Sequence, residues 1–207
     1  MVIHDRGERV PVTLPLIGTY NQCNAAIAYA VARSQGVAPE VVARGIESMA
    51  AVPGRLERVV DAPVSVIIDY AHTPDALEKV ITAVRAVTPA GQRITVVFGC
   101  GGDRDRSKRP VMGALATKLA DRVIVTSDNP RSEDPAAILV DIEVGIRRSG
   151  ATNYCIEPDR ATAIRRAITE AREGDVVLLA GKGHETYQIF ASGRVHFDER
   201  EIVREVM

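Results

Sequence analysis

Residues suited to a binding site are gathered in four short segments of the chain. Each segment comes directly after a short apolar run: residues 69–74, 99–104, 126–131 and 181–185. If the apolar runs are parallel strands of one sheet, the four segments meet at its carboxyl edge, where such sheets bind their ligands. One segment alone would be weak support, but four at the same edge predict a single site.

The segment 99–104 is rich in glycine. Gly99, Gly101 and Gly102 are expected to adopt positive φ and to let a ligand approach the backbone closely. The spacing differs from that of a dinucleotide-binding loop, because the third glycine of that pattern would fall on Arg104. The sequence also contains no phosphate-binding loop of the G-x-x-x-x-G-K-[ST] type.

Four cations follow these glycines and would form an anion-binding cluster if they converge. Arg104 stands nearest the end of the strand, and a guanidinium can pair with a carboxylate through two parallel hydrogen bonds. We therefore expect Arg104 to bind a carboxylate. Arg106 and Lys108 are expected to be solvated cations of an exposed loop, and Arg109 could belong to either group.

Residues 128–131 place an acid, an amide and a guanidinium within four positions. Pro130 restricts Asn129 to an extended conformation, which can turn its amide away from the backbone. An ordinary turn with an Asx hydrogen bond explains the same residues equally well. In residues 181–185, two glycines let Glu185 face the same crevice, where a carboxylate among cations would suit an ammonium or a zwitterionic amino acid. A surface salt bridge is the alternative for Glu185.

The segment 69–74 combines a carboxylate with an imidazole. Asp69 could hold a ribose hydroxyl or a metal-bound water, and His72 could stack on a base. The alternative is that Asp69 or Thr73 caps the following helix. The other histidines are expected to be surface, packing or capping residues, and the cysteines to be half-buried thiols: His4, His184, His196, Cys23, Cys100 and Cys155.

Composition excludes several classes of function. The 207 residues include 26 Lys and Arg against 27 Asp and Glu, so no basic excess points to nucleic acid or to an anionic membrane. No apolar run is long enough to cross a bilayer, and the first residues lack the apolar core of a signal peptide. Three widely spaced cysteines form neither a disulfide framework nor a metal pattern. We expect a cytoplasmic protein without a metal–thiolate site.

Strands and helices alternate from residue 64 onward. Strands are expected at 64–69, 94–98, 123–126, 153–156 and 176–180, and helices at 74–88, 111–120, 136–148, 161–172 and 199–206. Continuous apolar strands between amphipathic helices are typical of a parallel sheet covered on both faces. The predicted fold class is therefore α/β.

The first fifty-odd residues follow a different pattern. A strand interrupted by two prolines is expected at 8–16, and helices at 21–35 and from 39 to about 51. Two helices and a fragment of sheet cannot bury a core of their own, so this part is predicted to be the tail of a larger domain. We expect the turn-forming residues 53–55 to end it, and an apolar patch to stay exposed near residues 25–31.

Together these segments resemble the Mur ligases of peptidoglycan synthesis, in particular the type that adds meso-diaminopimelate. The match covers almost the whole chain in the order of the family. It rests on residues 18–24 (GTYNQCN), 53–57 (PGRLE), 69–77 (DYAHTPDAL), 99–104 with 108–110, 128–131 (DNPR) and 181–185 (GKGHE). A small departure is Ser107, since the family usually has glycine before Lys-Arg-Pro.

The resemblance implies a domain organisation. Residues 1–56 would be the end of a central ATP-binding domain, a fragment of an α/β P-loop domain. Residues 57–207 would be the complete C-terminal domain, which is Rossmann-like with a mostly parallel sheet covered by helices. The UDP-binding domain, the phosphate loop and the carbamylated lysine that holds magnesium are absent from these residues. ATP and Mg²⁺ would thus be bound mainly elsewhere, and the chain alone is expected to be inactive.

The chemistry implied by the resemblance is ATP-dependent amide synthesis. ATP phosphorylates the D-glutamate carboxylate of a UDP-N-acetylmuramoyl dipeptide. The amine of meso-diaminopimelate attacks the acyl phosphate, and phosphate leaves the tetrahedral intermediate. This chain, in a monomeric protein, would supply the amino-acid pocket and one wall of the nucleotide site, without a catalytic residue or metal ligand. Residues implied to bind the amino acid are Arg104, Asp128, Asn129, Pro130, Arg131, Gly181 and Glu185. Residues implied to contact the nucleotide are Asn21, Asn24, Arg55, Asp69 and His72.

Arg131 would explain the choice of amino acid. Its guanidinium can pair with the far carboxylate of meso-diaminopimelate, a group that lysine lacks. A buried cation left without this partner would penalise lysine roughly a hundred-fold or more.

Two other functions stay open on the sequence. A binding module without catalysis could use the same loops, but Asn21 and Arg55 would then face nothing. A lysine-adding ligase or a folylpolyglutamate synthase would share the fold, but residues 128–131 argue against both. The sequence therefore favours the diaminopimelate-adding ligase.

Overall fold

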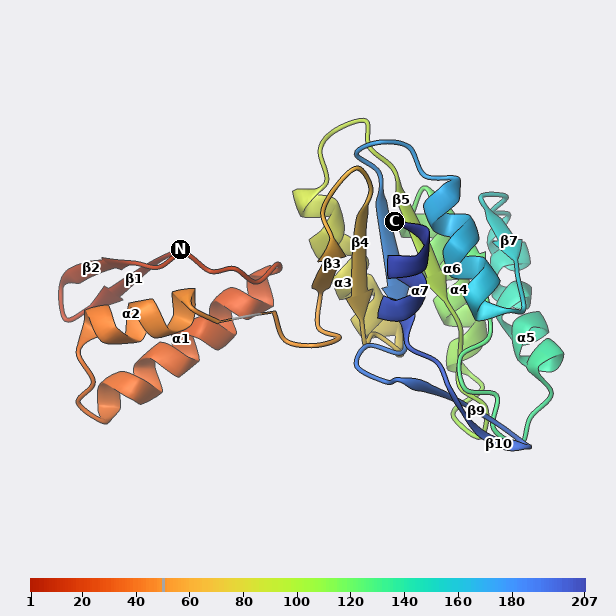
Figure 1. Cartoon of the computed structure of the whole chain (residues 1–207), viewed down its shortest axis with the longest axis horizontal. Coiled ribbons are helices and arrows are strands. Elements are labelled where there is room, and N and C mark those ends of the chain that lie inside the picture. The colour runs from red at the N-terminus through yellow and green to blue at the C-terminus, as the bar shows by residue number, and fades with distance from the viewer. Residues whose placement is uncertain (50) are drawn as a thin grey trace. The chain divides into compact units, whose positions relative to one another are not determined.

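The chain consists of two compact units, residues Met1–Val52 and Pro53–Met207 (Figure 1). The computed structural model describes residues 1–49 and 51–207. The division falls shortly before the expected domain boundary at residue 56.

The first unit combines an antiparallel ribbon with two helices. Its elements are β1 (Val2–Asp5), β2 (Glu8–Pro11), α1 (Thr19–Ser34) and α2 (Pro39–Glu47). Its buried apolar residues are Val12, Ala25, Tyr29, Val42, Ala43 and Ile46. The prediction that this part buries no core of its own is therefore wrong. β1 was not predicted from the sequence, and Met1 and Ile3 from this end of the chain pack against the core.

Two predicted boundaries in the first unit also need correction. The strand expected at 8–16 ends at Pro11, and the helix expected to reach about residue 51 ends at Glu47. The Ser48 hydroxyl donates to the Gly45 carbonyl, and such a local bond competes with continuation of the helix. Ala50, which the predicted helix included, lies outside the described part of the chain.

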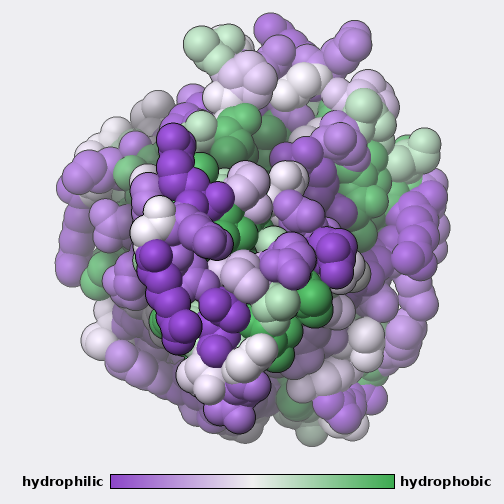
Figure 2. Space-filling view, turned by 90° about the vertical axis from the view of Figure 1, so that its left-hand side faces the viewer, coloured by the Kyte–Doolittle hydropathy of each residue, from purple (hydrophilic) through white to green (hydrophobic). Residues whose placement is uncertain are grey.

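The first unit keeps some apolar surface exposed. Ile27 and Val31 are 64% and 60% exposed, whereas Ala25 and Tyr29 of the same helix are buried. Figure 2 shows separate hydrophobic areas on a mainly hydrophilic face. Among the described residues, no helix combines the length and apolar character needed to traverse a bilayer.

The second unit is built on a six-stranded sheet with the order β3-β4-β8-β5-β6-β7. Five strands are parallel, and β3 pairs antiparallel with β4 at one edge. The strands are β3 (Glu57–Val60), β4 (Ser65–Asp69), β5 (Ile94–Phe98), β6 (Arg122–Val125), β7 (Tyr154–Ile156) and β8 (Val176–Ala180). This arrangement confirms the predicted α/β fold with a mostly parallel sheet; the sequence analysis missed only β3 in it.

Helices cover both faces of this sheet. α3 (Pro74–Val87), α4 (Lys108–Leu119) and α5 (Pro135–Ser149) lie on one face (Figure 1). On the other face, α6 (Arg160–Thr169) and α7 (Glu199–Val206) pack against apolar side chains of β4, β5, β6 and β8. Most strands therefore have both faces buried, which explains their continuous apolar sequences.

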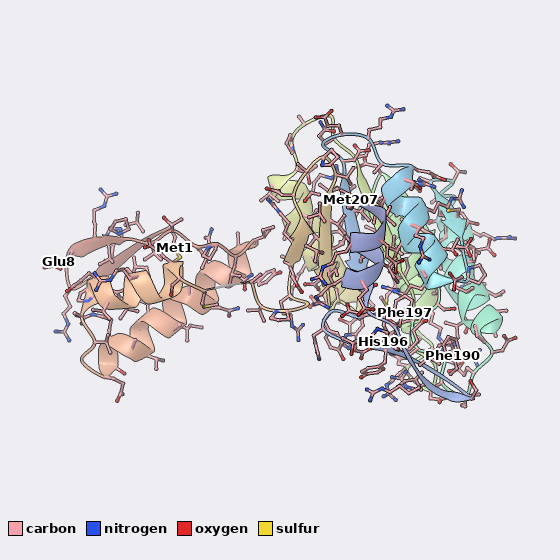
Figure 3. The ribbon with its side chains drawn as sticks, in the orientation of Figure 1. Met1, Glu8, Phe190, His196, Phe197 and Met207 are labelled. Atoms are coloured by element: carbon pink, nitrogen blue, oxygen red, sulfur yellow. The ribbon has the colours of Figure 1, made fainter. Side chains whose placement is uncertain are left out.

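A hairpin that the sequence analysis overlooked follows β8. β9 (Tyr187–Phe190) pairs antiparallel with β10 (Gly193–His196), and Figure 3 labels Phe190 and His196 at the ends of these strands. The hairpin lies at the lower edge of the sheet in Figure 1. The Gln188 side chain donates to the Asp128 carbonyl at 2.9 Å, so β9 contacts the segment that follows β6.

Candidate functional site

The four segments predicted to form one site do meet at the carboxyl edge of the sheet. They follow β4, β5, β6 and β8, which are parallel neighbours. Between them lies a cavity of about 320 Å³, at the lower end of the range of about 300–1,000 Å³ for small-molecule sites. Its lining is Tyr70, His72, Thr73, Gly101, Arg104, Asp105, Lys108, Asp128, Asn129, Arg131, Gly181 and Glu185.

The glycines after β5 do not adopt the backbone conformation expected of them. Gly99, Gly101 and Gly102 do not have positive φ, so that expectation is wrong. A Cβ atom on Gly102 would lie 1.8 Å from the Pro130 carbonyl oxygen. The Gly102 N–H donates to the Asn129 carbonyl at 2.9 Å. Glycine is required here because two loops touch backbone to backbone, which fixes residues 128–131 at the cavity.

Asn129 connects three parts of the site. Its amide nitrogen donates to Glu185 Oε2 at 2.9 Å. Its Oδ1 accepts from the Ile189 N–H of β9 at 3.0 Å and from Lys182 Nζ at 3.2 Å. The local Asx turn considered for Asn129 is therefore not what the structure contains. Long-range bonds to the loop after β8 and to β9 hold this amide instead.

Glu185 lines the cavity and keeps one of its carboxylate oxygens free of partners within the part of the chain that the structure describes. Its Oε2 accepts from Asn129 and Lys182, whereas its Oε1 has no hydrogen-bond partner among the described residues. The Glu185 side chain is only 13% exposed and Lys182 is fully buried, so their ion pair is not a surface salt bridge. A half-buried carboxylate oxygen without a partner can accept an ammonium group.

Two guanidinium groups line the same cavity. Arg131 has φ 56°, and its Nη1 donates to the carbonyls of Gly102 at 2.8 Å and Asn129 at 3.4 Å. These bonds leave Nε and Nη2 of Arg131 without partners among the described residues. Arg104 is exposed and donates to the carbonyl of Asp103 at 2.9 Å. Both cations are thus available for a carboxylate.

The other cations after β5 separate into different roles. Lys108 is half-buried, lines the cavity and donates to the His72 carbonyl at 2.7 Å, so its prediction as a solvated cation is wrong. Arg106 is exposed as expected and pairs with Asp141. Arg109 is fully buried against Asp141 and Glu133, which makes it part of the framework.

Asp69 is tied to the backbone. Its two oxygens accept the N–H groups of Leu56 and Ala71, both at 2.8 Å, and burial raises the pKa of this carboxyl. Asp69 does not cap the following helix, because Thr73 accepts from the Ala76 N–H in that position. In the structure, Asp69 therefore links the backbone of residue 56 to the end of β4.

The remaining residues predicted to contact the nucleotide lie in both units. The Arg55 guanidinium lies 5.0 Å from the centre of the Tyr70 ring, and His72 packs edge-on against that ring at 4.6 Å. Asn21 and Asn24 stand at the start of α1 in the first unit, where the Asn24 amide donates to Asn21 Oδ1 at 3.3 Å.

The guanidinium of Arg55 and the aromatic ring of Tyr70 are groups that suit one wall of a nucleotide site. For a metal ion such as Mg²⁺, the described residues contain no group of three or more His, Cys, Asp or Glu side chains placed to bind it.

Sequence reasoning missed Lys182 and the contribution of β9. Lys182 is fully buried beside the cavity, and Ile189 holds Asn129 from the hairpin. The sequence does contain a signal for the hairpin. Residues 187–190 and 193–196 are short strand-like runs separated by two residues, and the second run begins with a glycine.

Comparisons with known proteins identify the family of this chain. Residues 54–183 match the family model described as Mur ligase, glutamate ligase domain. The UDP-N-acetylmuramoyl-L-alanyl-D-glutamate–2,6-diaminopimelate ligase of Solibacter usitatus is 55% identical, over 98% of this chain and 40% of that protein. The enzyme of the same name from Synechococcus elongatus is 51% identical, over 94% of this chain and 39% of that protein. The chain spans about 40% of the length of these relatives.

Solved structures extend the comparison. A structure of a UDP-N-acetylmuramoyl-L-alanyl-D-glutamate–2,6-diaminopimelate ligase matches 99% of this chain and 42% of that one, with a TM-score of 0.73 and 38% identity. The UDP-N-acetylmuramate-alanine ligase of Thermotoga maritima has a TM-score of 0.71 at 21% identity, over 98% of this chain and 40% of that one, which shows the shared fold. The family match and the shared fold together show that this chain belongs to the Mur ligase family.

Proposed function

We propose that this chain supplies the amino-acid-binding domain of an ATP-dependent ligase. The ligase adds meso-diaminopimelate to UDP-N-acetylmuramoyl-L-alanyl-D-glutamate, the reaction named in its relatives. The observation that carries the proposal is the pairing of opposite charges in one cavity. Glu185 offers a free carboxylate oxygen there, and Arg104 and Arg131 offer free guanidinium donors.

An amino acid with two charged ends fits this arrangement. An ammonium group of the ligand would donate to Glu185 Oε1, and its carboxylates would accept from Arg131 and Arg104. Arg131 would bind the far carboxylate of meso-diaminopimelate, which lysine lacks. An ammonium in that place would be repelled by the guanidinium, and lysine would lose the charge-assisted pair as well.

The contribution of the chain to the reaction would be positioning. ATP supplies the phosphoryl group that activates the D-glutamate carboxylate. The cavity residues hold the amino acid so that its attacking amine meets the activated carbonyl carbon in a fixed direction. Such orientation removes a large entropic part of the barrier. Arg55 and Tyr70 would form one wall of the nucleotide site.

Titration of the ¹⁵N-labelled chain with meso-diaminopimelate and, separately, with L-lysine tests the proposal by NMR. We expect meso-diaminopimelate to shift backbone signals of residues 101–104, 128–131 and 181–185. L-Lysine should bind roughly a hundred-fold more weakly. Equal affinity for the two amino acids, or shifts confined to other regions, would contradict the proposal.

A further inference from the structure

Lys182 is a buried cation directly behind the cavity. It follows β8 between two glycines, and its side chain is 0% exposed. Nζ donates to Asn129 Oδ1 and to Glu185 Oε2, both at 3.2 Å. The rings of Tyr187 and Phe197 lie 5.7 and 5.9 Å from Nζ. Lys182 therefore touches both polar residues expected at the ammonium end of the ligand.

Lys182 cannot itself bind the ligand. Its neighbour Gly181 and its partner Glu185 line the cavity, but Lys182 does not. Burial lowers the pKa of Lys182, while the negative charges of Asp128 and Glu185 act in the opposite direction. A buried ammonium and a half-buried carboxylate are tolerated together because each compensates the charge of the other.

The hydrogen bonds of Lys182 set the orientation of the Asn129 amide. Oδ1 of Asn129 receives two donors, Lys182 Nζ and the Ile189 N–H. The NH₂ group must therefore point the other way, toward Glu185 Oε2. Because Lys182 and Asn129 both bind this one oxygen, the second oxygen of Glu185 stays free.

From this geometry we propose that Lys182 is a positioning residue for recognition of the ligand ammonium. It holds the Asn129 amide and the Glu185 carboxylate so that Glu185 Oε1 is presented to the amine of the amino acid. This inference rests on the proposed function and adds a residue that determines specificity for an amino group. Lys182 is not proposed as a catalytic residue, since it does not line the cavity.

The test compares meso-diaminopimelate with pimelate, which has the same carbon chain and both carboxylates but no amino group. Affinities of the full 207-residue chain for both ligands are measured by NMR titration. In Lys182→Met, we expect affinity for meso-diaminopimelate to fall roughly ten- to a hundred-fold, the effect of losing a charge-assisted hydrogen bond. Affinity for pimelate should stay the same, because its carboxylates contact Arg104 and Arg131.

Lys118→Met is the matched control. Lys118 is exposed on α4 and has no partner among the described residues, so the same substitution there should leave both affinities unchanged. If Lys182→Met does not fold, Lys182→Gln is used for the same titrations, since glutamine keeps a hydrogen-bond donor toward Asn129 but has no charge. It should show a smaller loss for meso-diaminopimelate alone.

The outcomes separate this inference from the proposed function. An equal loss of affinity for both ligands, or no loss in either Lys182 variant, overturns the positioning role. A wild-type chain without preference for meso-diaminopimelate over pimelate contradicts the proposed function instead. In that case the side-chain amide signals of Asn129 decide the role of Lys182. They shift in the Lys182 variants if Lys182 orients this amide, and unchanged signals refute it.

Discussion

Arg131 shows how one residue can combine a framework role with recognition. Its N–H donates to the Ile189 carbonyl, and its Nη1 donates to the Gly102 carbonyl of the neighbouring loop and to the Asn129 carbonyl of its own loop. A non-glycine residue with positive φ is uncommon, and such conformations concentrate at functional sites. The backbone and Nη1 thus hold the guanidinium in place, and the rest of the group stays available at the cavity.

We predict that Arg131→Ala lowers affinity for meso-diaminopimelate by about a hundred-fold or more, because the far carboxylate loses a charge-assisted pair. Binding of ATP by a protein that contains this chain together with a phosphate loop should change far less. Titration calorimetry with each ligand measures the two effects. Arg148→Ala is the control, since Arg148 is exposed on α5 without a partner among the described residues. Equal losses for amino acid and nucleotide would show that Arg131 has no specific role.

Gly102 gives a second prediction at the residue scale. In Gly102→Ala the new Cβ would meet the Pro130 carbonyl oxygen at 1.8 Å, so the loop that carries Asn129 must move. We expect a loss of about 1–3 kcal/mol in the free energy of unfolding, as for other overpacked sites. Binding of meso-diaminopimelate should weaken too. Thermal unfolding and ligand titration measure the two effects.

Gly45→Ala is the control for this substitution. Gly45 lies inside α2, and no atom stands within 4 Å of the position of its added Cβ. Alanine should be neutral or slightly stabilising there, because it favours helix over glycine by about 0.5–1 kcal/mol. Unchanged stability and binding in Gly102→Ala would refute the close approach of the two loops.

Ion pairs between elements fix the loops around the cavity. Arg160 of α6 is fully buried with Glu199 of α7, and its Nη2 donates to the Ala180 carbonyl at 2.9 Å. Ala180 is the last residue of β8, directly before Gly181. The two helices on one face of the sheet therefore hold the start of a cavity loop through one guanidinium.

On the other face, Arg109 of α4 performs a similar task. It pairs with Asp141 of α5 and with Glu133, and Oε1 of Glu133 accepts from the Asp103 N–H at 2.6 Å. The hydrogen bonds from Arg109, reinforced by the Asp103 N–H, lower the pKa of Glu133 to about 2. The pKa of an unfolded glutamate is about 4.3.

This shift predicts how stability depends on pH. Because the pKa of Glu133 is lower in the fold, its contribution is complete above about pH 4.3 and is lost as pH falls toward about 2. Glu133→Gln should lower the melting temperature at pH 7. Between pH 5 and pH 2.5 the melting temperature of this variant should fall less steeply than that of the wild type. Calorimetric scans at several pH values measure both effects. Glu173→Gln, at an exposed position without a partner among the described residues, should leave the wild-type profile unchanged.

At the scale of the whole molecule, the two units differ in the size of their cores. Among its described residues the first unit buries six apolar side chains, while the second unit buries both faces of most strands of a parallel sheet. Burial of apolar surface is the main favourable contribution to folding, so the first unit should open more readily.

We predict that backbone amides of residues 1–49 exchange with deuterium sooner than those of β4, β5 and β8. Hydrogen exchange followed by mass spectrometry measures this difference. Ile27→Glu, at a position 64% exposed, should not accelerate exchange in the first unit, whereas Ile46→Ala in its core should. Simultaneous exchange of both units would indicate a single cooperative fold.

The amino-acid sequence by itself determined the parallel strands and the helices of the second unit, and the segments of its site. Five apolar strands alternating with helices specify a parallel sheet, because each strand must bury both faces. The chain order then brings residues 69–74, 99–104, 126–131 and 181–185 to one edge. The local sequence pattern is sufficient to place these segments together, since the carboxyl ends of parallel strands lie at the same edge of the sheet whatever residues follow them.

Only the tertiary structure decided which side chains face the cavity. Lys108 and Arg109 are adjacent cations in the sequence, yet one lines the cavity and the other is buried in an ion-pair cluster. The glycines after β5 serve contacts between loops, and Asn129 is held by Lys182 and Ile189 from 53 and 60 residues away. Such contacts depend on distances between loops far apart in the chain, which local residue patterns do not encode.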